Sequence, residues 1–360
     1  MEPRVSARHG EPTAFGERML TVCGFSRAGR FGRILIMKTG LRAGEDILAG
    51  LSCPICRSSL EVAENALVCV RDACRSSFPI IEGVPVLINE ANSLFRVRDY
   101  LERKEVLYES HSRVVRFLKR LVPSPTRHIG AKARLREFAR LLLQLSESPK
   151  VLVVGGSILG AGMKELLSFN QVGVVESDVA FGPRTALICD AHDLPFKDET
   201  FDGVVAQAVL EHVVDPFRCV EEMHRVLKQD GIVYAETPFM QQVHGGPYDF
   251  LRFSHLGHRR LFRRFEEISS GAASGPAEAL VWAYESLLLS LARSQTARLI
   301  LKAFARWTSW WITYADYILL RSAGSLDAAC AYYFVGRRGR RLVPDKEILE
   351  GYRGFVSSAR

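Results

Sequence analysis

The sequence predicts an α/β protein built on a doubly wound, mostly parallel sheet. The first observation is an apolar run at 151–154, followed by a glycine-rich turn and then by the start of a helix at 164–167. The second is that further short apolar runs recur, several of which end in acidic residues, with a helical segment between the fourth and fifth. Strands that alternate with helices form parallel sheets whose ligands bind at the carboxyl ends of the strands.

The glycine turn contains Gly155, Gly156, Ser157 and Gly160. Backbone N–H groups in such a turn, together with a helix N-terminus, can bind a polar or negatively charged ligand. Many turns between a strand and a helix need glycine only because the backbone takes a positive φ. An ordinary turn and a nucleotide-type site therefore both remain open at this point.

The later strands are expected at 172–178, 185–190, 201–213 and 231–238, with a helix at 215–228 between the last two. Glu176 follows Gly155 by twenty-one residues. At this spacing a βαβ unit presents a carboxylate to the hydroxyl groups of a ribose. Asp178 is the alternative ribose partner, because it lies at the end of the same strand.

From 151 to 262 the chain resembles the class I S-adenosylmethionine-dependent methyltransferases, in particular the type 11 group. The resemblance rests on five pieces in the expected order, which displace a nicotinamide dehydrogenase as the interpretation. They are the glycine loop, Glu176, the run from Asp190 to Phe196, Phe201 with Asp202, and the run from Leu210 to Val213 with the strand that follows Gly231.

The resemblance implies a Rossmann-like sheet of seven strands with the last antiparallel, the sixth strand at 265–270 and the seventh at 328–336. It also implies the donor site: the glycine loop at the methionine end, Glu176 at the ribose, and Asp190 with the Ala191 backbone at the adenine. Gln207, at the fourth strand, completes the predicted cofactor-binding set of Gly155, Gly156, Ser157, Gly160, Glu176, Asp190, Ala191 and Gln207.

The chain departs from the family pattern at two positions of the loop. Val153 stands where the family usually has an acid, and Ser157 interrupts the glycines. A non-catalytic scaffold with a decayed methyltransferase domain is therefore the alternative function.

Length and charge place limits on the partners. A chain of 360 residues is long enough for a sizeable core and a small accessory domain. The net charge is +8, but 1–36 carry six Arg against three Glu and 337–360 carry seven Lys or Arg against three acids. The body between these ends is left near +1, which makes nucleic acid an unlikely partner and RNA methylation a poor interpretation. Each tail is interpreted as a solvated end, with a phosphate or anionic membrane contact as the alternative.

We divide the chain into a disordered basic extension (1–50), a zinc-ribbon-like domain (51–90), a helical linker or lid (91–147), the methyltransferase domain (148–336) and a basic tail (337–360). Residues 1–36 show no secretory signal, and Met37 is a candidate true start. The linker helices serve either as a lid on the cofactor or as plain packing helices.

Four of the eight cysteines, Cys53, Cys56, Cys69 and Cys74, fall within twenty-two residues. Two cysteines separated by two residues on a turn can place both thiolates on one tetrahedral ion, so a structural zinc is predicted. Disulfides and unrelated buried thiols are the alternatives. The segment from 51 to 90 resembles the small zinc-ribbon domain that activates some methyltransferases, and a docking role follows from that resemblance only.

The segment after the fifth strand, 236–254, concentrates polar and aromatic residues among glycines. We predict an acceptor-binding loop in which His244 or Asp249 takes the proton of a hydroxyl or amine nucleophile. His212, Tyr248 and Arg252 are the predicted substrate-binding residues. An ordinary surface loop, and a structural role for His212, are the alternatives.

An apolar helical insertion is expected at 276–324, with four aromatic residues at 307–314 and basic residues at 298, 302 and 306. Charged residues interrupt every apolar run, so a membrane span is excluded. The insertion either packs in the core or a homodimer, or lies on a membrane surface near a lipid-linked acceptor.

The predicted function is therefore methyl transfer from S-adenosylmethionine to an O or N nucleophile, in the cytoplasm. The acceptor is a small molecule, a glycan or a lipid-linked intermediate, and the sequence does not identify it.

Overall fold

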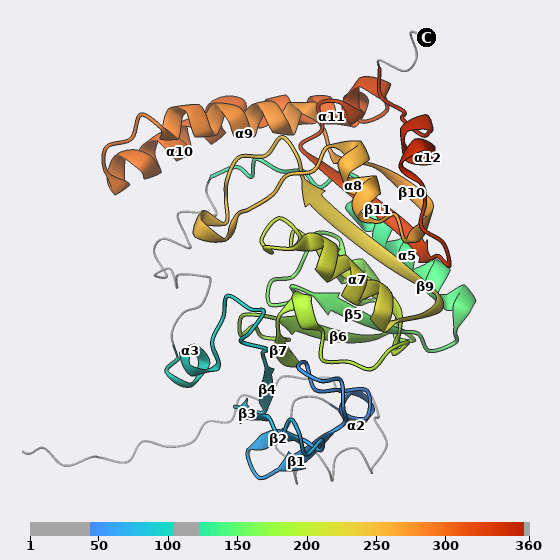
Figure 1. The fold of residues 1–360 in the computed structure, drawn as a ribbon. Helices are drawn as coiled ribbons and strands as arrows, with labels where there is room; N and C mark the ends of the chain where they lie inside the picture. Colours follow the sequence, from blue (N-terminus) through green and yellow to red (C-terminus); the bar gives the residue numbers. More distant parts are fainter. Residues whose placement is uncertain (1–43, 104–121, 356–360) are drawn as a thin grey trace, which may run out of the picture.

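The computed structural model describes residues 44–103 and 122–355, and its strands form one sheet (Figure 1). The strand order is β1-β2-β3-β4-β7-β6-β5-β8-β9-β11-β10. The predictions for a start at Met37, for the helical pattern at 106–121 and for the last five residues lie outside the described residues, as does the part of the predicted disordered extension up to residue 43. The rest of that extension, 44–50, contains the short helix α2 (Glu45–Leu48).

The predicted seven-stranded sheet is confirmed. It runs from β7 to β10, and its first five strands, β7, β6, β5, β8 and β9, pair in parallel in that order. β11 is antiparallel to both β9 and β10. The bounds are β5 Lys150–Val154, β6 Gly173–Asp178, β7 Leu187–Cys189, β8 Phe201–Gln207, β9 Leu227–Pro238, β10 Phe265–Ser274 and β11 Ala331–Arg338.

The apolar strands are covered by helices on both faces, because successive side chains of a strand point to opposite sides. Val151 and Val153 pack with Phe138 of α5 (Ala131–Leu145) on one side of the sheet. Leu152 belongs to the cluster that contains Met223 of α7 (Pro216–Val226) on the other. Val153, which occupies the position of the family's acid, is therefore a core residue.

The boundary between α7 and β9 differs from the prediction. The Asp215 side chain accepts from the Arg218 N–H and caps the helix, with Pro216 in its first turn. The helix ends at Val226, not at Lys228, because Leu227 already pairs with Phe201 of β8. The predicted fourth strand also ends early, at Gln207, so Glu211 and His212 lie in the turn that follows it.

The ribbon consists of β1 (Leu60–Ala63), β2 (Ala66–Cys69), β3 (Ser77–Ile81) and β4 (Val84–Leu87), which pair antiparallel in that order. β4 then pairs in parallel with β7, where Val86 lies opposite Ile188. The ribbon strands therefore continue the main sheet (Figure 1). The domain limits at 51–90 and 148–336 stay a prediction.

Arg57 adds a second contact between the ribbon and the main domain. Its guanidinium forms an ion pair of 2.8 Å with Glu222 of α7 and donates to the carbonyl oxygen of Leu194. This contact, which involves no strand pairing, places the ribbon against α7 as well as β7.

The insertion forms α9 (Pro276–Leu289), α10 (Gln295–Ser309), η3 (Trp310–Ala315), α11 (Asp316–Leu319) and η4 (Ala323–Leu326). These helices lie across the upper end of the molecule in Figure 1. No helix among the described residues is long and apolar enough to cross a bilayer. The remaining short helices are α2 (Glu45–Leu48), α3 (Val97–Leu101), α6 (Met163–Leu166), η1 (Ala191–Asp193), η2 (Gly246–Tyr248), α8 (His255–Leu261) and α12 (Asp345–Glu350).

Candidate functional site

The glycine turn lies at the carboxyl end of β5 and is held against its neighbours. The N–H groups of Gly155 and Gly156 donate to the Ser177 carbonyl oxygen at 2.9 and 3.0 Å. Gly155 has φ +77°, and a Cβ there would lie 2.3 Å from Val209. A Cβ on Gly156 would lie 2.8 Å from the Cβ of Glu176. These positions require glycine for close packing as well as for the turn.

The Asp178 carboxylate accepts hydrogen bonds from backbone N–H groups of the glycine turn and of the segment just after β6. One of its carboxylate oxygens accepts from the Ser157 N–H at 2.8 Å, and the other accepts from the Ala180 N–H at 2.9 Å. Of the two acids that end β6, Asp178 therefore braces the glycine turn. The Ser157 hydroxyl oxygen is buried without a hydrogen-bond partner among the described residues.

Glu176 is 3% exposed and has one occupied and one open carboxylate oxygen. Oε1 forms an ion pair of 2.8 Å with Arg184, whereas Oε2 is buried with no partner in the described part of the chain. Burial raises the pKa of Glu176 and the Arg184 charge opposes this rise. The open oxygen is the kind of acceptor that hydroxyl groups of a ligand would satisfy.

Gln207 lies at the end of β8 on the same edge of the sheet. Its amide nitrogen donates to the Ala161 carbonyl oxygen at 3.0 Å and to Glu236 at 3.2 Å. Its amide oxygen is buried and, within the described segments, has no donor. Ser157, Glu176 and Gln207, all predicted donor-site residues, thus each carry one buried polar atom without a partner.

Asp190 is held by the chain's own donors. The backbone N–H and Nδ1 of His192 lie 3.0 and 2.5 Å from one oxygen, and the Ser93 hydroxyl donates to the other at 2.6 Å. Burial alone would raise the pKa of Asp190, but these hydrogen bonds outweigh it and hold the pKa below its usual range. The segment after the ribbon therefore contacts the acid assigned to the adenine, and Ala191 beside it is buried.

Asp249 accepts several hydrogen bonds within the predicted acceptor loop. It accepts from the N–H groups of His244 and Gly245 at 2.9 and 3.1 Å and from two guanidinium nitrogens of Arg252. Burial would raise its pKa, but these donors outweigh it and hold the pKa well below the usual range. Such a carboxylate is a weak base, so the geometry favours a positioning role for Asp249.

Arg252 and Tyr248 also serve the shape of the loop. Arg252 donates to the carbonyl oxygens of Gln241 and Gln242 in addition to Asp249. The Tyr248 ring stacks on Phe95 with centroids 5.6 Å apart. Both residues were predicted to lie near the acceptor because of their place in the sequence. That place does not reveal the contacts that they make with the rest of the protein.

Three residues meet behind the loop. Nε2 of His212 and Nε2 of His244 each lie 3.8 Å from the same carboxylate oxygen of Glu211. Glu211 is fully buried, and neither of its oxygens has a hydrogen-bond partner among the described residues. Burial raises the pKa of Glu211 to about 8, and burial lowers the pKa of His244.

Glu211 was not among the residues predicted for the site, although it lies in the run from Leu210 to Val213. Glu236 was not predicted either, and it accepts from Gln207, from Tyr234 and from Arg134 at 3.2 Å. An acid at the end of a predicted strand was the available signal for Glu236. For Glu211 the available signal was its place beside a histidine just after a strand.

The four ribbon cysteines come together, as the zinc prediction requires. The Cys53 and Cys74 sulfurs lie 3.8 Å apart, and those of Cys56 and Cys69 lie 3.4 Å apart. All four sulfurs lie within 4.8 Å of one another, and none is in a disulfide. Zn–S bonds of about 2.3 Å in a tetrahedron put sulfurs about 3.8 Å apart. The cluster is compatible with a zinc ion.

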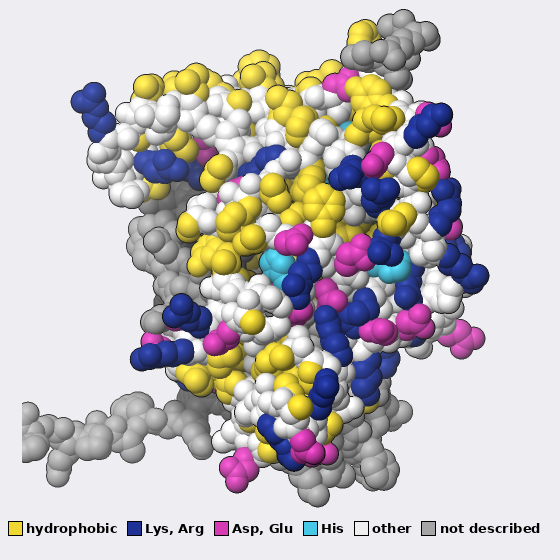
Figure 2. Space-filling model, in the orientation of Figure 1, with side chains coloured by type: hydrophobic (Ala, Val, Ile, Leu, Met, Phe, Trp, Pro, Cys, Tyr) yellow, Lys and Arg dark blue, Asp and Glu magenta, His cyan; other side chains and the backbone are white. Residues whose placement is uncertain are grey.

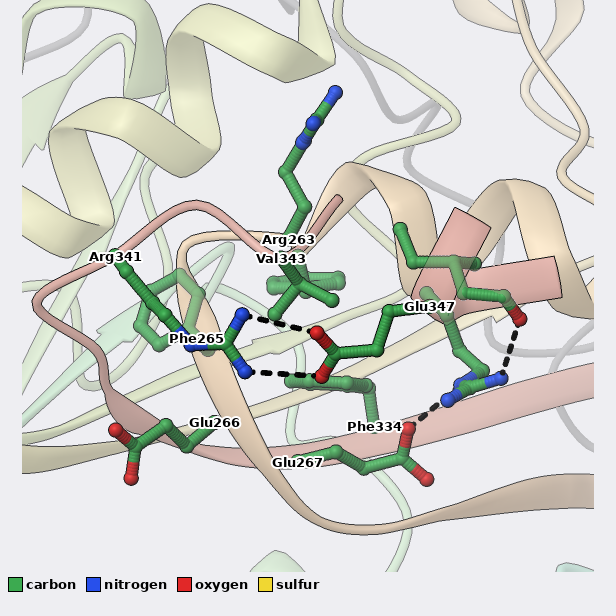
Figure 3. Close-up of a pocket in the computed structure, with 11 residues that line it drawn as sticks. Arg263, Phe265, Glu266, Glu267, Phe334, Arg341, Val343 and Glu347 are labelled. Atoms are coloured by element: carbon green, nitrogen blue, oxygen red, sulfur yellow. Dashed lines mark hydrogen bonds and ion pairs between the residues drawn. The ribbon is translucent and has the colours of Figure 1, made fainter. Parts of the chain in front are cut away.

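A pocket of about 310 Å³ lies away from these residues, between α8, β10, β11 and the segment 341–348 (Figure 3). Figure 3 shows Arg341 directed at Glu347, with which it forms an ion pair of 2.9 Å. The pocket lies where β11 ends, next to the start of β9. Ligands of parallel sheets bind at the opposite edge, so this pocket is not the candidate site.

Comparisons of the sequence with known proteins agree with the methyltransferase motifs. The family model described as "Methyltransferase domain" matches residues 167–235. A demethylmenaquinone methyltransferase of Lysinibacillus sphaericus is 34% identical over 97 residues, which are 27% of this chain and 36% of that protein. The chain therefore spans about a third of the length of this relative.

Two further matches are to another curated protein and to a solved structure. A UPF0434 protein of Nitrosococcus oceani is 41% identical over 46 residues, 12% of this chain and 75% of that protein. A structure of phosphoethanolamine N-methyltransferase 2 of Haemonchus contortus with S-adenosyl-L-methionine has 17% identity and a TM-score of 0.36, and the match covers 57% of this chain and 52% of that one. The chain carries a methyltransferase domain of the type 11 family of S-adenosylmethionine-dependent methyltransferases, and a segment of it belongs to the UPF0434 family.

Proposed function

We propose that this protein transfers a methyl group from S-adenosylmethionine to an oxygen or nitrogen atom of an acceptor. The observation that carries the proposal is the set of buried polar atoms without partners at the carboxyl ends of β5, β6 and β8. Ser157, Glu176 and Gln207 each contribute one such atom among the described residues. Because buried polar groups are normally hydrogen-bonded, these three atoms indicate a polar ligand.

The donor would be held along this edge of the sheet. Glu176 Oε2 would accept from the ribose hydroxyls. Ser157 lies within the glycine turn, and Gln207 donates to the Ala161 carbonyl oxygen at its end. When bound, S-adenosylmethionine supplies a methyl group on a positively charged sulfur. The residues present fit this ligand at the ribose and the loop, whereas the oxygens of Asp190 already accept from Ser93 and His192.

On the acceptor side, His244 is the proposed base. Its Nδ1 lies 3.2 Å from the Gln242 carbonyl oxygen and donates to it, which leaves Nε2 with a lone pair. Burial lowers its pKa, so the neutral ring that accepts a proton predominates near pH 7. Methyl transfer from a sulfonium depends mainly on in-line positioning, so the base assists the reaction.

An apolar face of the insertion supports a lipid-linked acceptor over a free glycan. Leu299, Trp307 and Trp311 are each more than half exposed on α10 and η3. Hydrophobic side chains gather along the upper edge of the molecule in Figure 2. Of the basic residues spaced by four, Lys302 and Arg306 pair with Glu285 of α9. Contact with a membrane would therefore be mainly apolar.

The alternative is a scaffold that binds a partner protein and no methyl donor. Val153 in the core and the occupied oxygens of Asp190 favour this alternative. Titration calorimetry with S-adenosylmethionine and S-adenosylhomocysteine tests it directly. Binding of both supports the enzyme, and the absence of heat with either would leave the scaffold as the function.

Single variants then test the base. His244→Ala is expected to lower kcat about 100-fold or more with little change in donor affinity. Asp249→Asn is expected to act through the loop, so it should raise KM and lower thermal stability while the pH profile of the residual activity stays as in the wild type. Full activity of His244→Ala would refute the assignment of the base.

A further inference from the structure

Glu211, His212 and His244 form a cluster whose arrangement is not explained by the proposed role of His244 as a base. Glu211 and His212 come from the turn after β8, and His244 comes from the loop after β9. The two imidazole rings meet edge to face, with centroids 5.1 Å apart. The cluster lies at the carboxyl edge of the sheet, beside the proposed donor site.

Backbone carbonyl oxygens determine which nitrogen of each histidine is free. Nδ1 of His212 lies 2.7 Å from the Tyr248 carbonyl oxygen, and Nδ1 of His244 lies 3.2 Å from that of Gln242. A carbonyl oxygen only accepts, so both Nδ1 atoms carry the proton and both neutral rings have a lone pair on Nε2. Metal-binding histidines are commonly oriented by such a bond from the second nitrogen.

Both lone pairs face a buried carboxylate. Each Nε2 lies 3.8 Å from the same oxygen of Glu211, too far for a hydrogen bond. Neither oxygen of Glu211 has a partner among the described residues, although the side chain is fully buried. Three acceptor atoms around one small space repel one another unless the carboxyl group carries a proton or a cation lies between them.

The distances suit a metal ion. The candidate ligand atoms of Glu211, His212 and His244 all lie within 4.8 Å of one another. Two ligands bound tetrahedrally at about 2.0–2.1 Å from one ion lie about 3.4 Å apart, and the distance of 3.8 Å from each Nε2 to the Glu211 oxygen is close to this value. The side chains of both histidines are 26% exposed, which leaves the ion an entry path.

We propose that Glu211, His212 and His244 form a binding site for a divalent transition metal ion of the Zn²⁺ or Fe²⁺ type. Two imidazoles and one carboxylate are a ligand set of catalytic zinc sites and of non-haem iron sites, both of which keep positions open for water or substrate. The site is separate from the four cysteines of the ribbon.

The role of the ion rests on the proposed function. With an ion bound, the Nε2 lone pair of His244 would serve as a ligand and not as the base. An open position of the ion would bind an acceptor hydroxyl and lower its pKa, so that the hydroxyl releases its proton to water. The metal site itself does not depend on this role, because it can be measured without donor or acceptor.

Metal stoichiometry of the full chain tests the site. The protein is dialysed against Zn²⁺, and anaerobically against Fe²⁺ in a parallel arm, and bound metal is measured by mass spectrometry. Wild type is expected to bind one equivalent more than Glu211→Gln, His212→Gln or His244→Gln. His224→Gln, which changes a histidine on α7 that contacts Gly339, is the matched control and should bind as much as wild type.

The proposal would be overturned if wild type and all three cluster variants bound the same amount of metal. It would also be overturned if wild type took up as much Mg²⁺ as it takes up Zn²⁺ or Fe²⁺. His244→Gln changes a partly exposed side chain, so it remains informative if Glu211→Gln does not fold. Calorimetry with S-adenosylhomocysteine separates the two proposals. Retained binding with no extra metal refutes the metal site alone, and extra metal without binding refutes the donor site alone.

Discussion

Arg184 and Glu176 form an ion pair of 2.8 Å that uses only one of the two carboxylate oxygens. The second oxygen is buried and has no partner within the described residues. The arginine therefore stabilises the charge of Glu176 while it leaves an acceptor at the edge of the sheet.

Glu176→Gln should weaken binding of S-adenosylhomocysteine about tenfold or more. Hydrogen bonds to a charged group contribute about 1.5–3 kcal/mol, and 1.4 kcal/mol corresponds to a factor of ten. Calorimetry provides the dissociation constants. Glu165→Gln, which changes the partly exposed ion-pair partner of Arg136, is the control and should bind normally. Equal affinity of both variants would contradict the assignment of Glu176 to the ribose.

Cys56→Ser should release the ribbon's metal and lower the free energy of unfolding by more than about 3 kcal/mol. The reason is that metal binding at a structural site contributes directly to folding. Zinc content and thermal unfolding are the measurements. Cys330→Ala changes a buried thiol outside the cluster and should keep the zinc. Full zinc content in Cys56→Ser would show that the thiolate is not a ligand.

Arg57→Ala should destabilise the contact between the ribbon and α7 by about 1 kcal/mol, because it leaves Glu222 without one of its partners and removes a bond to Leu194. The exposed pair of Arg75 with Asp72 offers a comparison, and Arg75→Ala should change stability by less than about 0.5 kcal/mol. Chemical denaturation of both variants measures the change in the free energy of unfolding. Indistinguishable curves would show that Arg57 does not hold the ribbon against α7.

Glu278 makes stability depend on pH. Burial raises its pKa from 4.5 to about 7, against the N–H of Arg127, which donates to it. Between these values the folded state keeps the proton that the unfolded state has released, so stability falls as pH rises from about 4.5 to 7. Glu278→Gln should remove this slope, which is at most about 1.4 kcal/mol per pH unit.

The measurement is the melting temperature of Glu278→Gln and wild type from pH 5 to 8. The variant should melt higher at pH 8 and show a smaller dependence on pH. Glu137→Gln, on the exposed side of α5, is expected to keep the wild-type slope. A wild-type slope in Glu278→Gln would mean that other groups titrate instead.

Trp307→Ser combined with Trp311→Ser should abolish flotation of the protein with anionic liposomes, because both indoles are exposed on the apolar face. Phe217→Ser, at an exposed aromatic residue of α7, should still float. If wild type does not float and instead sediments as a dimer that the double variant loses, the face is a protein interface.

The regular elements were predictable because each follows from a local pattern. The alternating sides of Val151 and Leu152 need only the two-residue period of a strand, and Asp215 with Pro216 predicted the start of α7. The end of α7 was placed two residues late, since the pairing of Leu227 with Phe201 is a contact between strands that local helical spacing does not reveal.

Most residues of the candidate site could be predicted from the sequence, but the role of each residue could not. The spacing from Gly155 indicated Glu176, but only the structure shows that Asp178 accepts from the glycine turn. Asp249 and His244 looked alike as bases in the sequence. Their difference depends on Arg252, whose guanidinium binds the carboxylate, and on Glu211, which faces the imidazole.

The parallel pairing of β4 with β7 determines how this chain can be shortened. A version that starts after residue 90 would present the backbone donors and acceptors of Ile188 and its neighbours to water, along an edge strand whose own residues, Leu187 to Cys189, carry no charge. Such an edge recruits strands from other molecules. A protein without the ribbon is therefore expected to self-associate even where its catalytic activity is unchanged.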